Sequence, residues 1–359
     1  MNAPVNFIHA EKLLVSVIIT TYNRVDALRE TLKALGNQTI SPDRYEILVT
    51  DDGSTDGTSE MLAQCELPCA LKAFRATKNG GISAGRNLAI PHARGKFIIF
   101  VSDDLIVPEN FIQTHLDTHE KYPKSWVVGG FQQLDSLTGT PFGRHLDKLE
   151  KSFEERRKSK QLGPNVWEMI YPTARNLSMQ RSDFELTGLF DEQFRSGCED
   201  QDLATQAEPY GIKFIYNDTI TSLHNDQAGD FKRYCHTQRR FAHDTVFYCA
   251  KYPAVHGDAQ LVHVNGPISS RDPLKLKVKK IIKRVLIIKP ATKAVELFIA
   301  LAERLRVPEA WLYRLYEITI GIYIFRGWRE GLESLRLKEE KRKSLIESGP
   351  TPNEKLSNV

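Results

Sequence analysis

The chain has 359 residues, of which 41% are hydrophobic and 26% are charged. This composition is typical of an ordinary globular protein, and the length suits one large α/β domain of roughly 250 residues with an extension. The net charge of +4 is unevenly spread, because residues 271–359 carry 20 Lys and Arg against 11 Asp and Glu, which gives +9 there and leaves −5 on the first 270 residues. A mildly acidic body argues against nucleic acid as its partner and raises the question of what the basic tail binds.

Neither the N-terminus nor the cysteines indicate a secreted protein. The opening segment, MNAPVNFIHAEKLLV, contains no basic stretch and no long apolar run, so we expect no secretion signal. The cysteines form no CxxC pair and no Cys/His metal spacing, which predicts reduced thiols in a cytosolic protein. They are Cys65, Cys69, Cys198, Cys235 and Cys249.

Alternating strand and helix patterns extend to about residue 130. Buried parallel strands read as continuous Val/Ile runs, and KFIIFV at residues 96–101 is the strongest of them. The pattern predicts an α/β fold with a doubly wound, mostly parallel sheet flanked by helices. In chain order we expect strands beginning at residue 15 and at 45–49, 71–76, 96–101 and 126–130, with helices at 26–35, 56–62, within 80–92 and at 108–122.

The pattern changes after residue 134. Residues 134–167 lose periodicity and gain charge, as in SFEERRKSKQ, which predicts a variable, mobile insertion. A helix from about residue 199, strands around 212–216 and 219–223, and a long helix at 230–252 follow. We therefore divide the chain into a catalytic-type domain at 1–265, a basic and aromatic helical extension at 266–345, and a disordered tail at 346–359.

Polar side chains follow the first two strands at the point where each strand ends. Thr20, Tyr22 and Asn23 end the first strand, and Asp51 and Asp52 end the second. Ligands of open α/β sheets bind just past the carboxyl ends of such strands. A base can stack on Tyr22, and a carboxylate can accept hydrogen bonds from a ribose hydroxyl or a base N–H. The sequence therefore predicts a nucleoside site at this edge.

Two adjacent carboxylates, Asp103 and Asp104, follow the strongest strand. Their repulsion is relieved by a cation or a proton, and Mg²⁺ or Mn²⁺ binds few carboxylates together with substrate phosphates. In isolation, one of them would cap the next helix and the other would be solvated. Because they share a sheet edge with Tyr22 and Asp52, we favour the metal.

Three further features are weaker on their own. Glu199 and Asp200 lie at an expected helix N-terminus, where carboxylates also serve simply to complement the helix dipole. Arg86 lies in the loop NGGISAGRN, which has neither a dinucleotide nor a P-loop spacing, and would by itself be paired with a structural carboxylate. His224 ends a strand-like run, and a single histidine is more often structural than a ligand.

The ordered set of these motifs resembles the family-2 glycosyltransferases. It comprises VSVIITTYNR, VTDDGSTDGT, NGGISAGRN, the SDD after KFIIF, NLSMQRSDFELTGLFDEQF, CEDQDL and the late LH, and covers roughly residues 13–225. The resemblance implies a GT-A fold and an inverting, metal-dependent enzyme that uses a nucleotide-diphospho-sugar. One departure is that Ser102 stands where an acid is commoner, which predicts a lower metal affinity.

The resemblance also implies roles for individual residues. It implies that a metal ion neutralises the charge of the leaving diphosphate. It also implies that Asp200, with Glu199 beside it, is the base that removes the proton of the acceptor hydroxyl. Asp104 is the metal ligand, and His224 matches a histidine that binds the metal in some members. The nucleotide site consists of Thr20, Tyr22, Asn23, Asp52, Arg86 and Asp103.

Two other functions share some of these features. A nucleotidyltransferase would carry a basic, Gly-rich loop directly after the first strand, and TTYNR is not such a loop. A catalytically degenerate nucleotide-sugar-binding or scaffold protein, recruited through its tail, is the alternative that stays open, because of Ser102. The donor sugar and the acceptor, a glycan or a lipid-linked molecule, carry no motif, and UDP-sugar is favoured only because it is frequent in the family.

The tail contains LKLKVKKIIKRVLIIKP at residues 274–290, in which aliphatic residues fall on one helical face and basic residues largely on the other. Either this helix lies on an anionic membrane surface, or it packs on the catalytic domain with a cationic face exposed. We favour the membrane, since such transferases often act on lipid-linked acceptors, and expect a cytoplasmic protein that is peripheral at the inner face of the cell membrane. Residues 311–328 are aromatic and too short to span a bilayer, which predicts interfacial docking or self-association.

Overall fold

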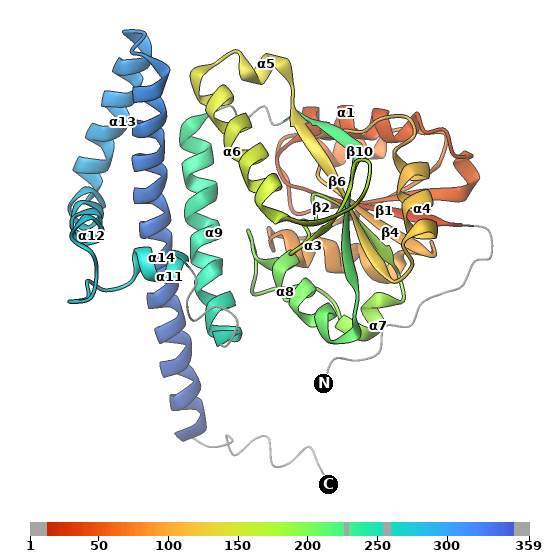
Figure 1. Cartoon of the computed structure of the whole chain (residues 1–359). Coiled ribbons are helices and arrows are strands. Elements are labelled where there is room, and N and C mark those ends of the chain that lie inside the picture. The colour runs from red at the N-terminus through yellow and green to blue at the C-terminus, as the bar shows by residue number, and fades with distance from the viewer. Residues whose placement is uncertain (1–12, 226–229, 254–259, 348–359) are drawn as a thin grey trace. The chain divides into compact units, whose positions relative to one another are not determined.

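The computed structural model describes residues 13–225, 230–253 and 260–347 and divides the chain into two units, Met1–Phe231 and Lys232–Val359. Figure 1 shows the sheet in the first unit and helices in the second. Most of the tail expected at 346–359 lies outside the described residues. The domain limits given above stay a prediction.

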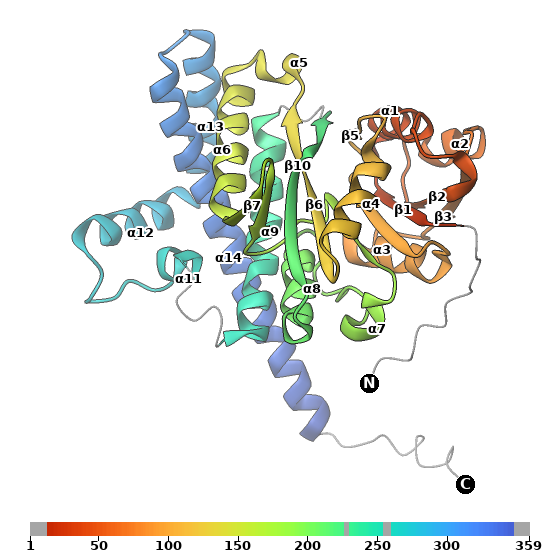
Figure 2. The ribbon, with the colours of Figure 1, turned by 45° about the vertical axis from the view of Figure 1, so that its right-hand side comes forward.

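One mixed sheet runs through the first unit, in the strand order β3-β2-β1-β4-β9-β6-β10-β8-β7, with β5 paired to β10. β3, β2, β1 and β4 are parallel neighbours, and the buried Val/Ile runs of β1, β2 and β4 predict this arrangement. β9 lies antiparallel between β4 and β6, and β6 and β10 run parallel side by side (Figure 2). The α/β class is therefore confirmed. The strands are β1 Val15–Thr21, β2 Tyr45–Asp51, β3 Ala70–Arg75, β4 Phe97–Val101, β5 Leu105–Ile106, β6 Ser125–Gln133, β7 Lys158–Gly163, β8 Val166–Met169, β9 Asn176–Gln180 and β10 Lys213–His224.

Successive strand residues enter two separate cores, one on each face of the sheet. On one face, Ile19 of β1 belongs to a cluster with Leu28 of α1 and Phe111 of α4. On the other face, Ile18 belongs to a cluster with Leu203 of α8. Helices thus cover both faces and leave the carboxyl ends of the parallel strands at one edge. The helices that flank the sheet are α1 Val25–Gly36, α2 Thr58–Ala63, α3 Ile82–Ala89, α4 Phe111–Lys121, α7 Asp183–Thr187 and α8 Glu199–Ala207.

Residues 134–167, for which we predicted an insertion without periodicity, form regular structure. They contain α5 (Asp135–Thr138), α6 (Pro141–Arg157), β7 and β8. α6 buries Phe142 and Leu146 in its first turns, and the Thr140 hydroxyl caps it by accepting a hydrogen bond from the N–H of Gly143 (2.9 Å). Because its later turns carry mostly charged, partly exposed side chains, the helical period fades there. The expected lack of regular structure was wrong, and the variability and mobility of the segment stay a prediction.

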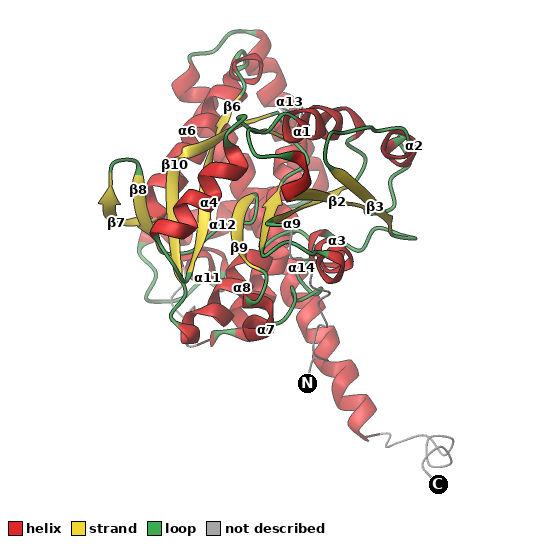
Figure 3. Ribbon diagram, turned by 90° about the vertical axis from the view of Figure 1, so that its right-hand side faces the viewer, coloured by secondary structure: helices red, strands yellow, loops and turns green. Residues whose placement is uncertain are grey.

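The second unit contains only helices among its described residues (Figure 3). Leu312, Tyr316, Tyr323 and Trp328 of α14 and Ile299 of α13 are buried in it. The segment 311–328, for which we predicted docking or self-association, therefore supplies core residues. No helix within the described ranges is long and apolar enough to span a membrane. The helices are α9 Phe231–Lys251, whose first residue belongs to the first unit, α11 Gln260–Asn265, α12 Leu274–Leu286, α13 Lys289–Arg304 and α14 Glu309–Glu347.

Candidate active site

The carboxyl ends of β1, β2 and β4 meet at one edge of the sheet and are tied together by hydrogen bonds. The N–H of Asp52 donates to the carbonyl oxygen of Thr21 (2.9 Å). The Thr21 hydroxyl in turn donates to Oδ2 of Asp103 (2.7 Å). The structure thus brings together the strand ends from which the sequence predicts a nucleotide site.

Asp52 is buried, and its carboxylate is held by the glycine loop that precedes α3. Oδ1 accepts a hydrogen bond from the N–H of Gly80 and Oδ2 one from the N–H of Gly81, each at 2.8 Å. Gly81 has a φ of 94°, and a Cβ there would lie 2.7 Å from the carbonyl oxygen of Arg195, so the position requires glycine. Asp52 therefore braces the loop, and only its remaining lone pairs are left for a nucleoside.

The residues that follow β1 form a turn braced against the loop after β2. The N–H of Asn23 donates to Oγ of Ser54 (2.9 Å), and its Oδ1 accepts from the N–H of Thr55 (2.8 Å). Oγ1 of Thr20 is buried and has no hydrogen-bond partner among the described residues. Tyr22 is 45% exposed. Asn23 thus fixes the turn, and Tyr22 presents a ring on which a base can stack.

Two buried carboxylates follow β4 and are bridged by one arginine. Nη1 of Arg24 donates to Oδ1 of Asp103 (3.2 Å) and to Oδ2 of Asp104. Burial and the neighbouring Asp104 raise the pKa of Asp103 to about 6. Burial acts in the same direction on Asp104, but His224 and Arg24 hold the pKa of that carboxyl well below its usual range. The positive charge of Arg24 relieves the repulsion within the pair.

His224 reaches this pair through a long-range strand pairing. β5 begins directly after Asp104 and runs antiparallel to the end of β10, with His224 opposite Leu105. Nε2 of His224 lies 3.3 Å from Oδ2 of Asp104, and its Nδ1 lies 3.0 Å from Nε2 of Gln133. Burial disfavours a charged ring, yet the Asp104 carboxylate raises the pKa of His224 above its usual value.

Glu199 and Asp200 begin α8, and both are buried. Nη1 of Arg86 donates to Oε1 of Glu199 (2.8 Å), and its Nη2 donates to the carbonyl oxygen of Ala174 (3.1 Å). Burial, followed by the neighbouring Asp200, raises the pKa of Glu199 although Arg86 opposes the shift. Arg86 is therefore paired with a carboxylate, and its contact with a nucleotide stays a prediction.

A two-residue segment connects this acidic helix start to the turn after β4. The N–H of Ala174 donates to Oδ2 of Asp200 (3.2 Å). The N–H of Ser102 donates to the carbonyl oxygen of the next residue, Arg175 (2.9 Å). The candidate base and the carboxylate pair thus belong to one hydrogen-bonded edge of the sheet.

The carboxylate pair offers part of a divalent metal site. Oδ1 of Asp104 is buried without a hydrogen-bond partner in the described part of the chain. Within the same ranges, no three or more His, Cys, Asp or Glu side chains form a ready-made metal cluster. Mg²⁺ uses one or two carboxylates plus substrate phosphates, and Mn²⁺ shares its preference for oxygen ligands. The chemistry of Asp104 and His224 is therefore compatible with a cation that binds together with a phosphorylated substrate.

Two arginines near the carboxylates were missed in the sequence. Arg24 ends the quoted motif VSVIITTYNR, so a signal was present: a cation placed directly after the polar turn. Arg175 helps to lower the pKa of Asp104, and its Nη1 lies 3.3 Å from Oε1 of Glu150. Arg175 directly precedes the motif NLSMQRSDF, but the pairing of β4 with β9 is what brings its segment to the site.

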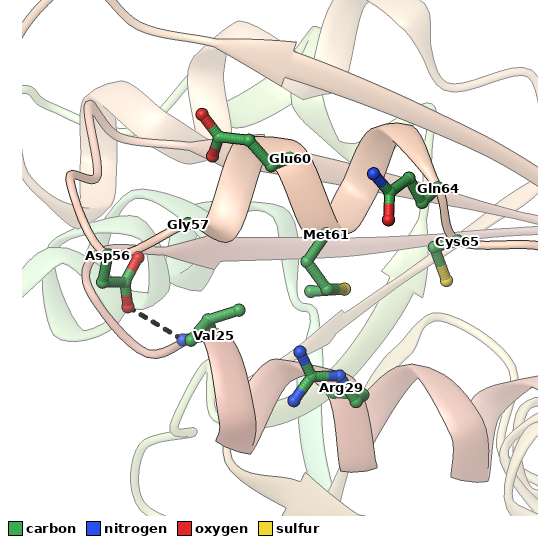
Figure 4. Close-up of a pocket in the computed structure, with 8 residues that line it drawn as sticks. All are labelled: Val25, Arg29, Asp56, Gly57, Glu60, Met61, Gln64 and Cys65. Carbon is green, nitrogen blue, oxygen red and sulfur yellow. Dashed lines mark hydrogen bonds between the residues drawn. The ribbon is translucent and has the colours of Figure 1, made fainter.

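A separate pocket of about 530 Å³ lies between α1 and α2 (Figure 4). Val25 and Arg29 of α1 line it opposite Glu60 and Met61 of α2. Oδ2 of Asp56, at its rim, accepts a hydrogen bond from the N–H of Val25 (3.0 Å). The lining contains no residue predicted for the nucleotide, the metal or the base, so we assign the pocket no part in this site.

Comparison with known proteins agrees with the family resemblance of the sequence. Residues 16–179 match the family model described as glycosyl transferase family 2. An uncharacterized glycosyltransferase of Bacillus subtilis, YfnE, is 28% identical over 294 residues, which cover 70% of this chain and 74% of that protein. Validoxylamine A glucosyltransferase of Streptomyces hygroscopicus subsp. limoneus is 27% identical over 223 residues, 55% of this chain and about half (49%) of that protein.

A solved structure supports the fold. The mannosyltransferase PcManGT from Pyrobaculum calidifontis superposes with a TM-score of 0.57 at 19% identity, covering 91% of this chain and 90% of that one. At this identity the likeness speaks for the architecture alone. Together with the match of residues 16–179 to the family model and with the sheet-edge motifs, this likeness supports a family-2 glycosyltransferase with a GT-A fold.

Proposed function

We propose that the enzyme transfers one sugar from a nucleotide-diphospho-sugar to a hydroxyl group of a glycan or lipid-linked acceptor, with inversion at the anomeric carbon. One observation carries the proposal. The turn after β4, with Asp103 and Asp104, is hydrogen-bonded to the same two-residue segment that holds Asp200. Leaving-group stabilisation and proton removal would therefore act on one bound substrate.

The nucleotide would bind where β1 and β2 end. Tyr22 would stack on the base, and Asp52 and Asp103 would accept hydrogen bonds from the base or ribose. We propose a UDP-sugar as the first donor to test. GDP-sugars are the competing class, because PcManGT was solved with GDP-Man and Mn²⁺.

Asp104 and His224 would hold Mn²⁺ or Mg²⁺. When bound there, the cation would neutralise the charge that develops on the leaving diphosphate. Arg24 would release Asp104 as the donor binds, and its guanidinium would stay near the phosphates as a second positive charge. Ser102, in place of the acid commoner in the family, leaves Asp104 as the main carboxylate ligand.

Asp200 would act as the general base. Its carboxylate would take the proton of the acceptor hydroxyl as that oxygen attacks the anomeric carbon from the face opposite the diphosphate. The new C–O bond forms as the bond to the diphosphate breaks, so one displacement inverts the configuration. Arg86 and Glu199 would position the start of α8 and thereby Asp200.

The proposal includes a place of action. The basic second unit suits attachment to the anionic inner face of the cell membrane, where a lipid-linked acceptor is available. The alternative function, a degenerate nucleotide-sugar-binding or scaffold protein recruited through the same unit, is favoured only by Ser102.

Thermal unfolding of the full chain with UDP, GDP, dTDP or CMP, each with and without Mn²⁺, tests the proposal. A ligand at about a hundred times its Kd stabilises a protein by ~2.7 kcal/mol, or roughly 5–10 °C for a unit of this size. We expect one nucleoside diphosphate to stabilise the chain only with Mn²⁺. Asp104→Asn should remove this stabilisation, and Asp117→Asn, at an exposed site on α4, should keep it. If no nucleotide raises the melting temperature, the catalytic proposal fails.

A further inference from the structure

α12 exposes its aliphatic side chains and buries lysines. Lys280 is 2% and Lys283 7% exposed, whereas Ile281 is 50% and Val285 57% exposed. A helix that simply completed the core of its unit would do the reverse. The orientation of α12 therefore keeps an aliphatic face available.

Specific partners hold the two lysines inside. Nζ of Lys280 donates to Oδ2 of Asp272 and to the carbonyl oxygen of Pro267, each at 2.8 Å. Nζ of Lys283 donates to Oδ1 of Asn265 (2.7 Å), and burial lowers the pKa of Lys283 to about 8. A buried cation is tolerated only with such partners, so these contacts fix the rotation of the helix about its axis.

α13 continues the pattern on the side that faces away from α14. It packs on α14 through buried residues that include Ile299 and Ala302, while Leu297, Phe298 and Leu301 are more than half exposed. Two consecutive helices thus present aliphatic and aromatic side chains outward. Scattered exposed apolar residues are ordinary, but a large number of them on two helices that contact each other indicates an interaction surface.

The acidic side chains of these helices lie toward the interior of the unit, and the exposed charged side chains are basic. Glu296 and Glu303 of α13 accept hydrogen bonds from the buried tyrosines Tyr323 and Tyr316 of α14, and Asp272, before α12, is buried against Lys280. The acids of the two helices and of the turn that precedes them are therefore engaged on the inner side. The exposed charges of α12 and α13 are basic: Lys275, Lys279, Lys293 and Arg304.

We propose that this face binds an anionic lipid bilayer, with its apolar side chains in the interface and its basic side chains on the lipid phosphates. Insertion of an apolar face combined with attraction of Lys and Arg to anionic headgroups is how interfacial helices bind membranes. A second copy of the chain would bring like charges together. The inference rests on the membrane part of the proposed function and is independent of the chemistry. The α12–α13 surface consists of Leu274, Val278, Ile281, Ile282, Val285, Ile288, Leu297, Phe298, Leu301 and Leu305, which are all exposed.

Co-sedimentation of the full chain with vesicles tests the surface. Vesicles of phosphatidylcholine with phosphatidylglycerol are compared with phosphatidylcholine alone. The variant Ile281→Ser/Val285→Ser removes two exposed side chains of the surface, and Leu332→Ser/Leu337→Ser removes two of similar exposure (46% and 57%) on α14. We expect the wild type to bind the anionic vesicles only. Binding should be at least about tenfold weaker in the α12 variant and unchanged in the α14 variant.

Three results would overturn the inference: no binding to anionic vesicles, equal binding by the α12 variant, or a lipid-free dimer that the α12 variant loses in light scattering. Nucleotide-dependent thermal stabilisation is recorded on the same samples. If vesicles bind and no nucleotide does, the catalytic proposal fails while the surface stands. If nucleotide binds and vesicles do not, the surface fails alone.

Discussion

Arg86→Met removes the buried partner of Glu199 and is expected to destabilise the first unit strongly. Nη1 of Arg86 lies 2.8 Å from Oε1 of Glu199, and both side chains are less than a tenth exposed. The guanidinium carbon also lies 5.5 Å from the ring centroid of Phe100 and 5.1 Å from that of Phe190. Methionine fills part of this space but supplies no positive charge.

The size of the expected destabilisation follows from the Glu199 carboxylate, which the substitution leaves buried without a cationic partner. Removing one partner of a buried ion pair costs about 3–5 kcal/mol, because the remaining charge is left uncompensated. For a unit of this size, 1 kcal/mol lowers the melting temperature by roughly 2–4 °C. The expected loss is therefore about 6–20 °C. Arg86→Met/Glu199→Gln removes the stranded charge as well and should recover at least half of the loss, which gives a coupling between the two sites.

Urea and thermal unfolding of wild type, both single variants and the double variant measure this coupling. Arg29→Met is the matched control, because the Arg29–Asp26 pair is more than half exposed and should be worth at most about 1 kcal/mol. A cost below about 1 kcal/mol for Arg86→Met, or additive effects in the double variant, would show that the Arg86–Glu199 pair does not stabilise the first unit. Lost nucleotide affinity without lost stability would instead support the nucleotide contact predicted for Arg86.

Three further predictions concern pH, metal and the glycine loop. Burial lowers the pKa of His115 to about 3 and that of His119 to about 4. The folded chain therefore excludes protons that the unfolded chain binds below about pH 6.5, and each histidine should lower the free energy of unfolding by roughly 1.4 kcal/mol per pH unit as pH drops from 6 to 5. The raised pKa of Asp103 acts in the opposite direction, so urea titrations at both pH values compare wild type with His115→Gln/His119→Gln; the same pH dependence in both proteins would contradict the prediction. Arg24→Ala should raise the affinity for Mn²⁺ about tenfold without nucleotide, because a competing cation is removed; paramagnetic resonance of free Mn²⁺ measures it, and unchanged or weaker binding would contradict the displacement. Asp52→Ala should cost roughly 2–4 kcal/mol, because two loop N–H groups lose a charged acceptor; unfolding curves that coincide with wild type would show that the brace is dispensable.

The sequence predicted the parts of this fold that rest on local pattern. The Val/Ile runs of β1, β2 and β4 and the polar residues after them determine both the parallel sheet and the edge where the candidate site lies. The two strands expected at 212–216 and 219–223 are one strand, β10, whose pairing with β6 is irregular between Asn217 and Ser222. Local polarity there reads as a turn, but pairing with β6 carries the strand through.

Side-chain partners across long distances in the chain were not predictable. Arg86 and Glu199 are 113 residues apart, and the contact of His224 with Asp104 depends on the pairing of β5 with β10. α12, which buries lysines and exposes aliphatic side chains, shows a further limit of prediction from sequence. The amphipathic pattern correctly located its aliphatic face, but the burial of Lys283 depends on Asn265, in a segment that carries no signal of its own.

Turnover by Asp200→Asn is the decisive test of the proposed transfer mechanism. The release of nucleoside diphosphate from candidate donor sugars is measured with Mn²⁺ for wild type, Asp200→Asn and the control Asp117→Asn, alongside nucleotide-dependent stabilisation. Since the amide keeps the shape of the carboxylate but accepts no proton, we predict that Asp200→Asn loses turnover by at least about a hundredfold and keeps nucleotide binding. Turnover equal to wild type would contradict the assignment of Asp200 as the base.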